Sequence, residues 1–478
     1  MRSVKVVSRK ILNYYYQSMY KLLYDIFCKM YGPFGVYKRV LSHEKIIYTK
    51  EAATLLNILS QKNALLIYIQ QIISNNKLFY GEFSLRLILC SSLMIPKIHA
   101  MVSEKDSTEK ICNELSLIKK ISRNILKDLS FSIEGSFLKY HYLTIKNNLE
   151  TKVYFKTAMY MAKEFLKIIS LLRNFKNKKH YLEIFIIKTP GTMDISIFKG
   201  FILTLQNQTQ ISNMQLRNNI VILYKKTITV KKIKDLRKSL RKMKMHEFIQ
   251  GHSNIIILTC SEMNPIVEKI MHREKIHIIT GIKEDDLEKF LRHRKNTLFS
   301  NDAYLMKIPL VYSYNIQHQT FIFLEDPSET SLATVLLTGA NQEDLMFSRL
   351  LLIKTIKYMN YIDSGCGFVP GGGYTELQLS HNLIKVAKRG SLLRFSLVWS
   401  MSSGLQQVVS ELLRNAGMQS PKVVKNLHEF LYNNAYYINA RKKCFSLLKF
   451  SRCYEFLVLY DNFLLNLFQV IISVVRLK

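Results

Sequence analysis

The sequence predicts a multidomain protein of mixed α and β class, with helical segments at both ends of the chain and an α/β segment between them. Two observations support this prediction. Apolar residues recur at helical spacing from Ile11 to Met30, and a long apolar segment runs from Phe456 to Val475, whereas short β-rich runs alternate with helices in the middle. At roughly 150 residues per domain, a chain of 478 residues accommodates about three domains.

The composition excludes a disordered chain and gives an ambiguous basic charge. Hydrophobic residues make up 48% of the chain and charged residues 22%, which is enough apolar material for several cores. Lys and Arg number 69 against 35 Asp and Glu, a net charge of +34. One Trp against 27 Tyr and 26 Phe, with abundant Lys, Ile and Asn, indicates AT-biased codon usage. The basic excess is therefore in part compositional and does not by itself predict an anionic partner.

The cysteines and the chain ends favour a reducing compartment without membrane insertion. The seven cysteines are odd in number and form no CxxC pair and no Cys/His metal spacing. The basic start, Met1 to Lys10, lacks the apolar region of a secretory signal. The apolar segment Phe456 to Val475 is interrupted by Asp461, Asn462, Asn466 and Gln469. We therefore expect a buried terminal helix there rather than a membrane anchor.

Helical periodicity dominates the first third of the chain. A helix is predicted over Ile11 to Met30, and the turn Tyr31-Gly32-Pro33-Phe34-Gly35 ends it. A short strand is expected at Lys45 to Tyr48. Further helices are predicted over Glu51–Ile73, Glu82–Met94 and, as several long amphipathic segments, Lys105–Leu172.

From Tyr181 onward, strands alternate with helices, which predicts an α/β unit. The expected strands are Leu182–Lys188, Phe201–Leu205, Asn219–Tyr224, Asn254–Thr259, Ile276–Thr280, Val311–Tyr314, Thr320–Leu324 and Thr334–Leu337. The expected helices are Lys231–Gln250, Pro265–Arg273 and Glu343–Tyr361.

Three consecutive glycines, Gly371, Gly372 and Gly373, stand directly before a predicted helix. Glycines in such a turn let the backbone approach a phosphate or another chain segment closely. The pattern fits a phosphate-binding loop and an ordinary structural turn alike.

Six motifs, in the same chain order, resemble the group II chaperonins of the CCT family. They are Tyr31–Gly35 (Leu-Gly-Pro-x-Gly in the family), Thr49–Leu56 (Thr-Asn-Asp-Gly-Ala-Thr-Ile-Leu), Asn254–Cys260 (the apical Asp-Val-Val strand), Thr334–Gly339 (Thr-Ile-Leu-Leu-Arg-Gly), Pro370–Glu376 (Pro-Gly-Gly-Gly-x-Thr-Glu) and Leu412–Gly417 (Leu-x-x-Asn-Ala-Gly). Within the family, Cys28–Gly35 and Leu87–Leu93 resemble the McKusick–Kaufman/Bardet–Biedl chaperonin-like branch.

The resemblance implies the group II chaperonin subunit fold, with a helical equatorial domain, a small intermediate domain and an α/β apical domain. It assigns 1–104 and 373–478 to the equatorial domain, 105–190 and 309–372 to the intermediate domain, and 191–308 to the apical domain. Only about 30 residues separate Leu223 from Asn254, so the resemblance implies a shortened apical lid.

The resemblance also implies a function, partners and a location. The branch implies assistance in assembling the BBSome, a ciliary transport complex, together with other chaperonin-like subunits, CCT and unfolded or partly assembled clients. The expected location is the cytoplasm, centrosome and ciliary basal body, with no membrane span.

The resemblance places a nucleotide site at seven residues: Gly32, Pro33, Gly35, Gly81, Gly371, Gly372 and Gly373. The carboxylates that the family uses for hydrolysis are replaced. Glu82 is a weak stand-in for the Mg²⁺-binding Asp of Gly-Asp-Gly-Thr-Thr, and Tyr436 to Asn439 replaces the nucleoside-contacting Gly-x-Asp. Lys354, 17 residues before Gly371, occupies the position of the water-orienting Asp. We therefore expect a degenerate ATPase site without catalytic residues or a resident metal, and no cofactor beyond weakly bound ATP with Mg²⁺.

The predicted helix Lys231 to Gln250 concentrates positive charge. Its candidate partner-binding residues are Lys231, Lys234, Arg237, Lys238 and Arg241, and its apolar stripe is Ile233, Leu236, Leu240, Met243 and Phe248. This helix is interpreted either as a surface for an acidic partner or as a solvated face. A nucleic-acid site is disfavoured because aromatic residues do not interleave with the cations.

Two rival functions stay open: an ATP-dependent CCT-type subunit that binds unfolded protein, and a basic nucleic-acid-binding protein. Other clusters do not predict a site. His272 and His277 fit no zinc spacing, Cys366 has no matching His and Asp, and an acidic group at a predicted helix start suits the helix dipole (Asp285, Asp286 and Glu288).

Overall fold

The computed structural model describes most of the chain in two compact units. The described residues are 9–42, 45–60, 64–75, 83–101, 107–132, 137–173, 181–205, 214–224, 254–261, 268–269, 273, 276–293, 297–300, 303–316, 319–326, 332–360, 367–418, 436–447 and 453–476. The first unit combines the two ends of the chain, Met1–Leu166 and Ile353–Lys478, and the second comprises Lys167–Leu352. The five-segment domain division expected from the sequence is finer than this and stays a prediction.

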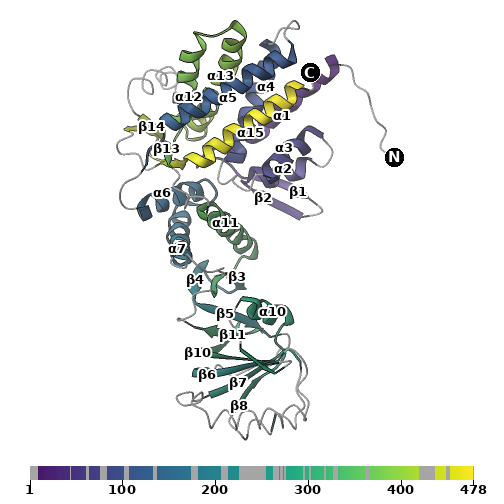
Figure 1. Ribbon diagram of the computed structural model, residues 1–478, viewed down its shortest axis with the longest axis vertical. Coiled ribbons are helices and arrows are strands. Elements are labelled where there is room, and N and C mark those ends of the chain that lie inside the picture. The colour runs from purple at the N-terminus through teal and green to yellow at the C-terminus, as the bar shows by residue number, and fades with distance from the viewer. Residues whose placement is uncertain are drawn as a thin grey trace, which may run out of the picture. The chain divides into compact units, whose positions relative to one another are not determined.

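The first unit is mainly helical. Its helices are α1 (Arg9–Phe27), η1 (Cys28–Met30), α2 (Ala52–Leu59), α3 (Ala64–Asn75), α4 (Phe83–Met101), α5 (Thr108–Asp128), α6 (Phe137–Glu150), α12 (Tyr374–Ala387), α13 (Leu392–Asn415) and α15 (Leu457–Arg476). The boundary between the units falls within α7 (Phe155–Arg173) and α11 (Gln342–Asn360). Helix α4 packs against α1, α13 and α15, and α15 also runs along α5 (Figure 1). Segments from both ends of the sequence therefore share one apolar core.

Short strand pairs connect these helices. Strand β1 (Lys38–Ser42) pairs with β2 (Lys45–Thr49), β13 (Phe368–Pro370) with β16 (Tyr454–Phe456), and β14 (Tyr436–Asn439) with β15 (Cys444–Leu447), all antiparallel. The β13–β16 pair brings the chain before the glycine triplet next to the chain before α15.

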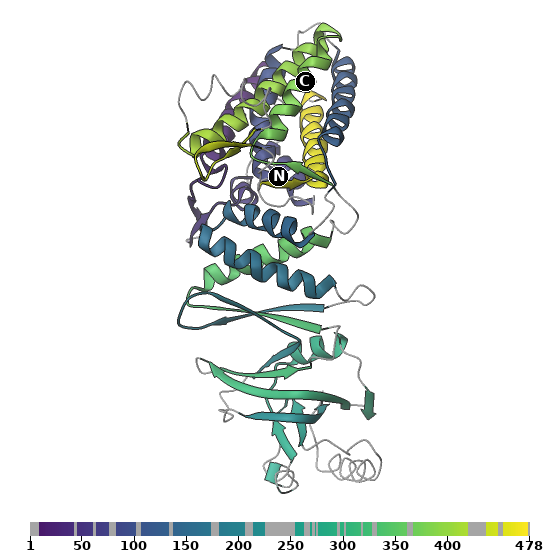
Figure 2. The same ribbon diagram turned by 90° about the vertical axis from the view of Figure 1, so that its left-hand side faces the viewer.

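The second unit is built on two sheets (Figure 2). The larger has the order β5-β11-β10-β6-β7-β8, with β9 paired to β10: β5 (Gly200–Thr204), β6 (Gln215–Tyr224), β7 (Asn254–Thr259), β8 (Ile276–Ile279), β9 (Thr297–Ser300), β10 (Ala303–Ile316) and β11 (Gln319–Glu325). Strands β6, β7 and β8 are parallel, and α10 (Glu284–His293) buries Leu287 and Phe290 in the core of this sheet. In the smaller sheet, β12 (Leu332–Gly339) lies between β3 (Tyr181–Lys188) and β4 (Asp194–Phe198).

The secondary structure largely matches the sequence expectations. Strand β7 coincides with its predicted range, because a buried parallel strand produces a continuous apolar run. The single helix predicted over Glu51 to Ile73 is wrong: α2 ends at Leu59 and α3 begins at Ala64. The terminal helix is confirmed as α15, whose buried residues pack on α4 and α5. Among the described residues, α15 is the one helix long and apolar enough to cross a membrane, a property it shares with core helices.

Candidate functional site

The glycine triplet forms the turn between β13 and α12. The Gly371 N–H donates to the Cys453 carbonyl at 2.9 Å, and the Gly372 carbonyl accepts from the Ile438 N–H at 3.0 Å. Gly372 and Gly373 have φ values of +65° and +83°. A Cβ at Gly371 would lie 2.7 Å from the Cys453 Sγ, and one at Gly372 would lie 2.8 Å from the Ile438 oxygen. The packing of this turn therefore requires glycine, with or without a phosphate.

The N-terminal turn is equally constrained. A Cβ at Gly35 would lie 2.0 Å from the Met30 oxygen, and Gly32 has a φ of +84°. The Asn415 side-chain amide at the end of α13 donates to the carbonyls of Cys28 and Tyr31, both at 2.8 Å. These hydrogen bonds connect the motif Tyr31–Gly35 to the motif Leu412–Gly417, although the two are far apart in the sequence.

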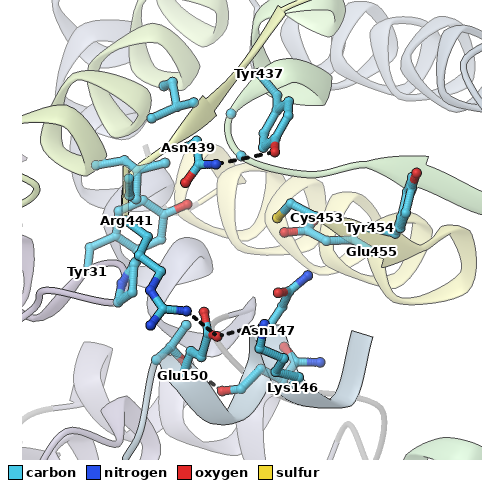
Figure 3. Close-up of a pocket in the computed structure, with 18 of the residues that line it drawn as sticks. Tyr31, Lys146, Asn147, Glu150, Tyr437, Asn439, Arg441, Cys453, Tyr454 and Glu455 are labelled. Carbon is cyan, nitrogen blue, oxygen red and sulfur yellow. Dashed lines mark hydrogen bonds and ion pairs between the residues drawn. The ribbon is translucent and has the colours of Figure 1, made fainter. Parts of the chain in front are cut away.

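A pocket of about 240 Å³ lies within the first unit and includes three of the predicted nucleotide-site residues: Pro33, Gly372 and Gly373. Its remaining lining residues are Tyr31, Phe83, Arg86, Lys146, Asn147, Asn148, Glu150, Thr151, Leu412, Tyr437, Ile438, Asn439, Ala440, Arg441, Lys442, Cys453, Tyr454 and Glu455. Strand β14 is the segment predicted to replace the nucleoside-contacting Gly-x-Asp, and it contributes Tyr437, Ile438 and Asn439 to the lining. Figure 3 shows Tyr437 and Asn439 at one side of this pocket, and Lys146, Glu150 and Arg441 at another.

A buried ion-pair cluster forms one wall. The Arg86 guanidinium donates two hydrogen bonds to the Glu455 carboxylate, at 2.9 and 2.8 Å, and lies 3.0 Å from the Glu376 carboxylate. Burial alone would lower the pKa of Arg86, but Glu376 and Glu455 hold that pKa above its ordinary value. Burial raises the pKa of Glu376, and Arg86 opposes this effect. Arg86 therefore neutralises the charge of one carboxylate and shares its own with a second. Because Glu455 is held by Arg86, its carboxylate is already engaged.

A second charged cluster, Lys146, Glu150 and Arg441, lies across the pocket, and within it only Arg441 is exposed. The Glu150 carboxylate lies 3.3 Å from the Lys146 ammonium and 3.8 Å from the Arg441 guanidinium (Figure 3). Lys442 also lines the pocket and is exposed. The lining thus contains four basic side chains and two carboxylates.

The described lining does not fit Mg²⁺. This ion prefers carboxylate and water oxygens in an octahedral arrangement, and both lining carboxylates already face cations. Within the described ranges, no three His, Cys, Asp or Glu side chains form a group that could hold a metal. Gly81 and Glu82 lie outside the described residues.

Lys354, in α11, forms an ion pair with Glu51, the N-cap residue of α2. Burial lowers the pKa of Lys354 to about 8, while the Glu51 carboxylate acts in the opposite direction. The neighbouring Lys50 is buried and donates from its Nζ to the Pro33 carbonyl at 3.1 Å. Lys50 directly precedes Glu51 in the chain, so its hydrogen bond links the Lys354–Glu51 pair to the turn Tyr31–Gly35.

The remaining candidates lie elsewhere. Lys231, Lys234, Arg237, Lys238 and Arg241 lie outside the described residues, as do His272 and Cys366. His277 lies in β8, and Asp286, in the first turn of α10, accepts a hydrogen bond from the Thr204 N–H at 3.2 Å. Asp286 therefore links α10 to the sheet, which supports a structural role for this acidic group.

Sequence analysis missed the charged residues of the pocket. Arg86 interrupts the apolar run Leu85-Arg86-Leu87-Ile88-Leu89, and a lone charge within a buried helix indicates a buried partner. Its partner Glu455 is 369 residues away, however, and no local pattern identifies it.

Comparison with protein families gives a match. The model of the TCP-1/cpn60 chaperonin family matches residues 23–475, which is nearly the whole chain. Comparison with curated proteins gives no match.

Proposed function

Because the chain belongs to the TCP-1/cpn60 chaperonin family, we propose that it is a chaperonin-like protein that assists assembly of a multiprotein complex without hydrolysing ATP. The observation that supports this most directly is the Lys354–Glu51 ion pair. Lys354 occupies the position at which the family resemblance expects a carboxylate. A cation held by a carboxylate cannot orient an attacking water as a carboxylate would.

The engaged carboxylates of the pocket support the same proposal. Glu455 is held by Arg86, and Glu150 faces Lys146 and Arg441. Phosphoryl transfer relies on a metal to bridge and neutralise the phosphate oxygens. The described lining offers no uncompensated carboxylate to hold that metal.

The proposed client is the BBSome, and the proposed partners are other chaperonin-like subunits and CCT. The support is the resemblance of Cys28–Gly35 and Leu87–Leu93 to the McKusick–Kaufman/Bardet–Biedl branch. The proposed location is the cytoplasm, centrosome and basal body.

A steady-state ATPase assay on the purified full chain tests the absence of hydrolysis. We expect no turnover above that of a heat-denatured control, with or without Mg²⁺. Mg²⁺-dependent turnover that disappears in Glu82→Ala would contradict the proposal and favour an active CCT-type subunit.

A pull-down from ciliated cells tests the assembly role. We expect CCT subunits and BBSome components to be recovered with the wild-type chain. Recovery of neither would refute the proposed client while leaving the family assignment intact, because fold does not specify function.

A further inference from the structure

The turn that joins α12 to α13 concentrates positive charge. From Leu377 to Ser410 the chain contains no Asp or Glu, and the basic residues of that range gather around the turn: Lys385, Lys388, Arg389 and Arg394. The first three, here called the cation group, are exposed. No described carboxylate lies within ion-pair distance of the cation group. Both views show this turn at an outer end of the first unit (Figures 1 and 2).

Exposed apolar side chains begin at the same turn. Leu392, the first residue of α13, is 85% exposed, and Trp399 is 50% exposed. Phe395 lies between them in the sequence and stacks on Trp399, with the ring centroids 6.2 Å apart. Because positions three and four apart share one face of a helix, these three residues form one apolar stripe. A leucine as exposed as Leu392 has little contact with its own chain and projects into solvent.

The turn is held in place by a hydrogen-bonded cap. The Ser391 hydroxyl accepts a hydrogen bond from the Arg394 N–H at 3.2 Å and donates one to the Glu114 carboxylate of α5 at 3.2 Å. The Arg394 guanidinium donates to the same carboxylate at 2.7 and 3.3 Å. Arg394 is therefore neutralised, while the cation group keeps its charge. A surface fixed in this way binds without a large cost of ordering its own backbone.

We propose that the α12–α13 turn docks on an anionic phospholipid surface, with the apolar stripe in the interfacial layer and the cation group against the headgroups. The charge of the cation group is complementary to such a surface. Tryptophan, leucine and phenylalanine beside lysine and arginine are the composition of interfacial anchors. A projecting leucine enters a fluid bilayer without a preformed pocket, which a folded acidic protein would have to supply. This inference goes beyond the proposed function, since none of these residues lines the pocket described above.

The fluorescence of one residue tests this inference directly, because Trp399 is the only tryptophan in the chain. The full chain is mixed with phosphatidylcholine vesicles, either pure or containing about one third phosphatidylserine. The chain should sediment with the phosphatidylserine vesicles, and its emission should shift to shorter wavelength as the indole leaves water. Added salt should weaken both effects. Absence of binding to these vesicles, or binding with unchanged emission, would overturn the inference.

Charge variants test the cation group. Lys388→Gln/Arg389→Gln should weaken binding to phosphatidylserine vesicles by about tenfold or more, because each cation near an anionic surface contributes about fivefold. Lys139→Gln/Lys156→Gln is the matched control, since it removes two charges from exposed lysines of α6 and α7. The control should bind nearly as well as the wild type. Equal losses in the two double variants would show that net charge alone is responsible, and would refute the docking site.

A second pair of variants tests the apolar stripe. Leu392→Asn should weaken vesicle binding about three- to tenfold and reduce the emission shift of Trp399, because the apolar side chain no longer enters the bilayer. Leu138→Asn is the matched control, since Leu138 is 54% exposed on α6. Circular dichroism confirms folding of each variant. Equal effects of the two substitutions would place the contact outside the stripe and contradict the proposal.

Two further measurements identify a different occupant of this surface. A polyglutamate peptide without lipid should leave the emission of Trp399 unchanged, because it offers no apolar phase. A shift as large as that produced by the vesicles would favour an acidic protein as the partner. Leu392→Asn should have the sedimentation coefficient of the wild type, and dissociation of an oligomer would show that a second copy of the chain covers the stripe. Either contrary result overturns the proposed lipid surface.

Discussion

Lys354 forms an ion pair with Glu51 and thereby joins α11 to the N-cap of α2. Lys354 occupies the position at which the family resemblance expects the water-orienting Asp, and Glu51 belongs to the motif Thr49–Leu56. The ion pair makes Lys354 part of a structural contact between α11 and α2. Removing the pair should lower the free energy of unfolding of the first unit.

Lys354→Asp should destabilise the first unit by about 1–2 kcal/mol, because it places two carboxylates together at a partly exposed site. Lys354→Met removes the cation without adding repulsion, so it should lower the free energy of unfolding by less than Lys354→Asp does. Urea unfolding followed by circular dichroism measures both variants. Equal stability of Lys354→Asp and the wild type would show that the pair does not contribute.

The lowered pKa of Lys354 predicts a specific pH dependence. Its folded-state pKa of about 8 lies below the unfolded value, so between about pH 8 and pH 10.4 the unfolded chain binds more protons at this residue. The contribution of Lys354 to stability should therefore rise with pH across that window. The stability difference between the wild type and Lys354→Met, measured from pH 7 to pH 10, should shift in favour of the wild type. A constant difference would contradict the lowered pKa.

Gly372→Ala should destabilise the first unit by about 3–4 kcal/mol, since a positive φ and a close backbone contact both oppose a Cβ. Gly417→Ala is the matched control: Gly417 has a φ of +69°, against +65° for Gly372, but its Cβ would meet only the Lys443 Nζ at 3.7 Å. The control should cost about 1–2 kcal/mol. Urea unfolding of both variants measures the difference, and equal losses would show that the contact with Ile438 is not limiting.

Arg86→Met should cost about 3–5 kcal/mol, because it leaves Glu376 and Glu455 as uncompensated carboxylates, one of them buried. Adding Glu376→Gln to this variant should restore part of the stability. The comparison variant is Arg123→Met, which breaks the pair of Arg123 with Asp461, 40% and 27% exposed, and should cost less than about 1 kcal/mol. Thermal unfolding ranks the three variants. A loss in Arg86→Met as small as that in Arg123→Met would refute the buried-pair account.

Most of the fold could be predicted from local patterns in the sequence. The buried strands of the second unit are apolar runs, and the glycine and proline turns end helices where expected. Strands β13 to β16 were missed because each has only three or four residues; β14 and β15 form a short hairpin, whereas β13 and β16 pair across a long stretch of chain. The pairing of β13 with β16 depends on tertiary contacts that no short window contains.

The glycine turns of the site could be predicted from the sequence, but the pairing of its charged side chains could not. The glycines of both turns stand out in the sequence as motifs, and Gly32, Gly372 and Gly373 adopt the positive φ values that favour glycine. The pairing of Arg86 with Glu455, and of Arg441 with Glu150, depends on how distant segments meet. The Lys354 substitution was detected by its spacing from Gly371, but its partner Glu51 became evident only in the structure.

The hydrogen bonds from Asn415 to Cys28 and Tyr31 have a consequence for biosynthesis. Asn415 lies 387 residues after Cys28, so the first turn emerges from the ribosome long before its partner is translated. The second unit, Lys167–Leu352, lies wholly within the sequence that precedes Asn415 and can complete its own core first. Until α13 and α15 have been translated, helices α4 and α5 therefore expose the apolar surfaces that α13 and α15 cover in the folded protein.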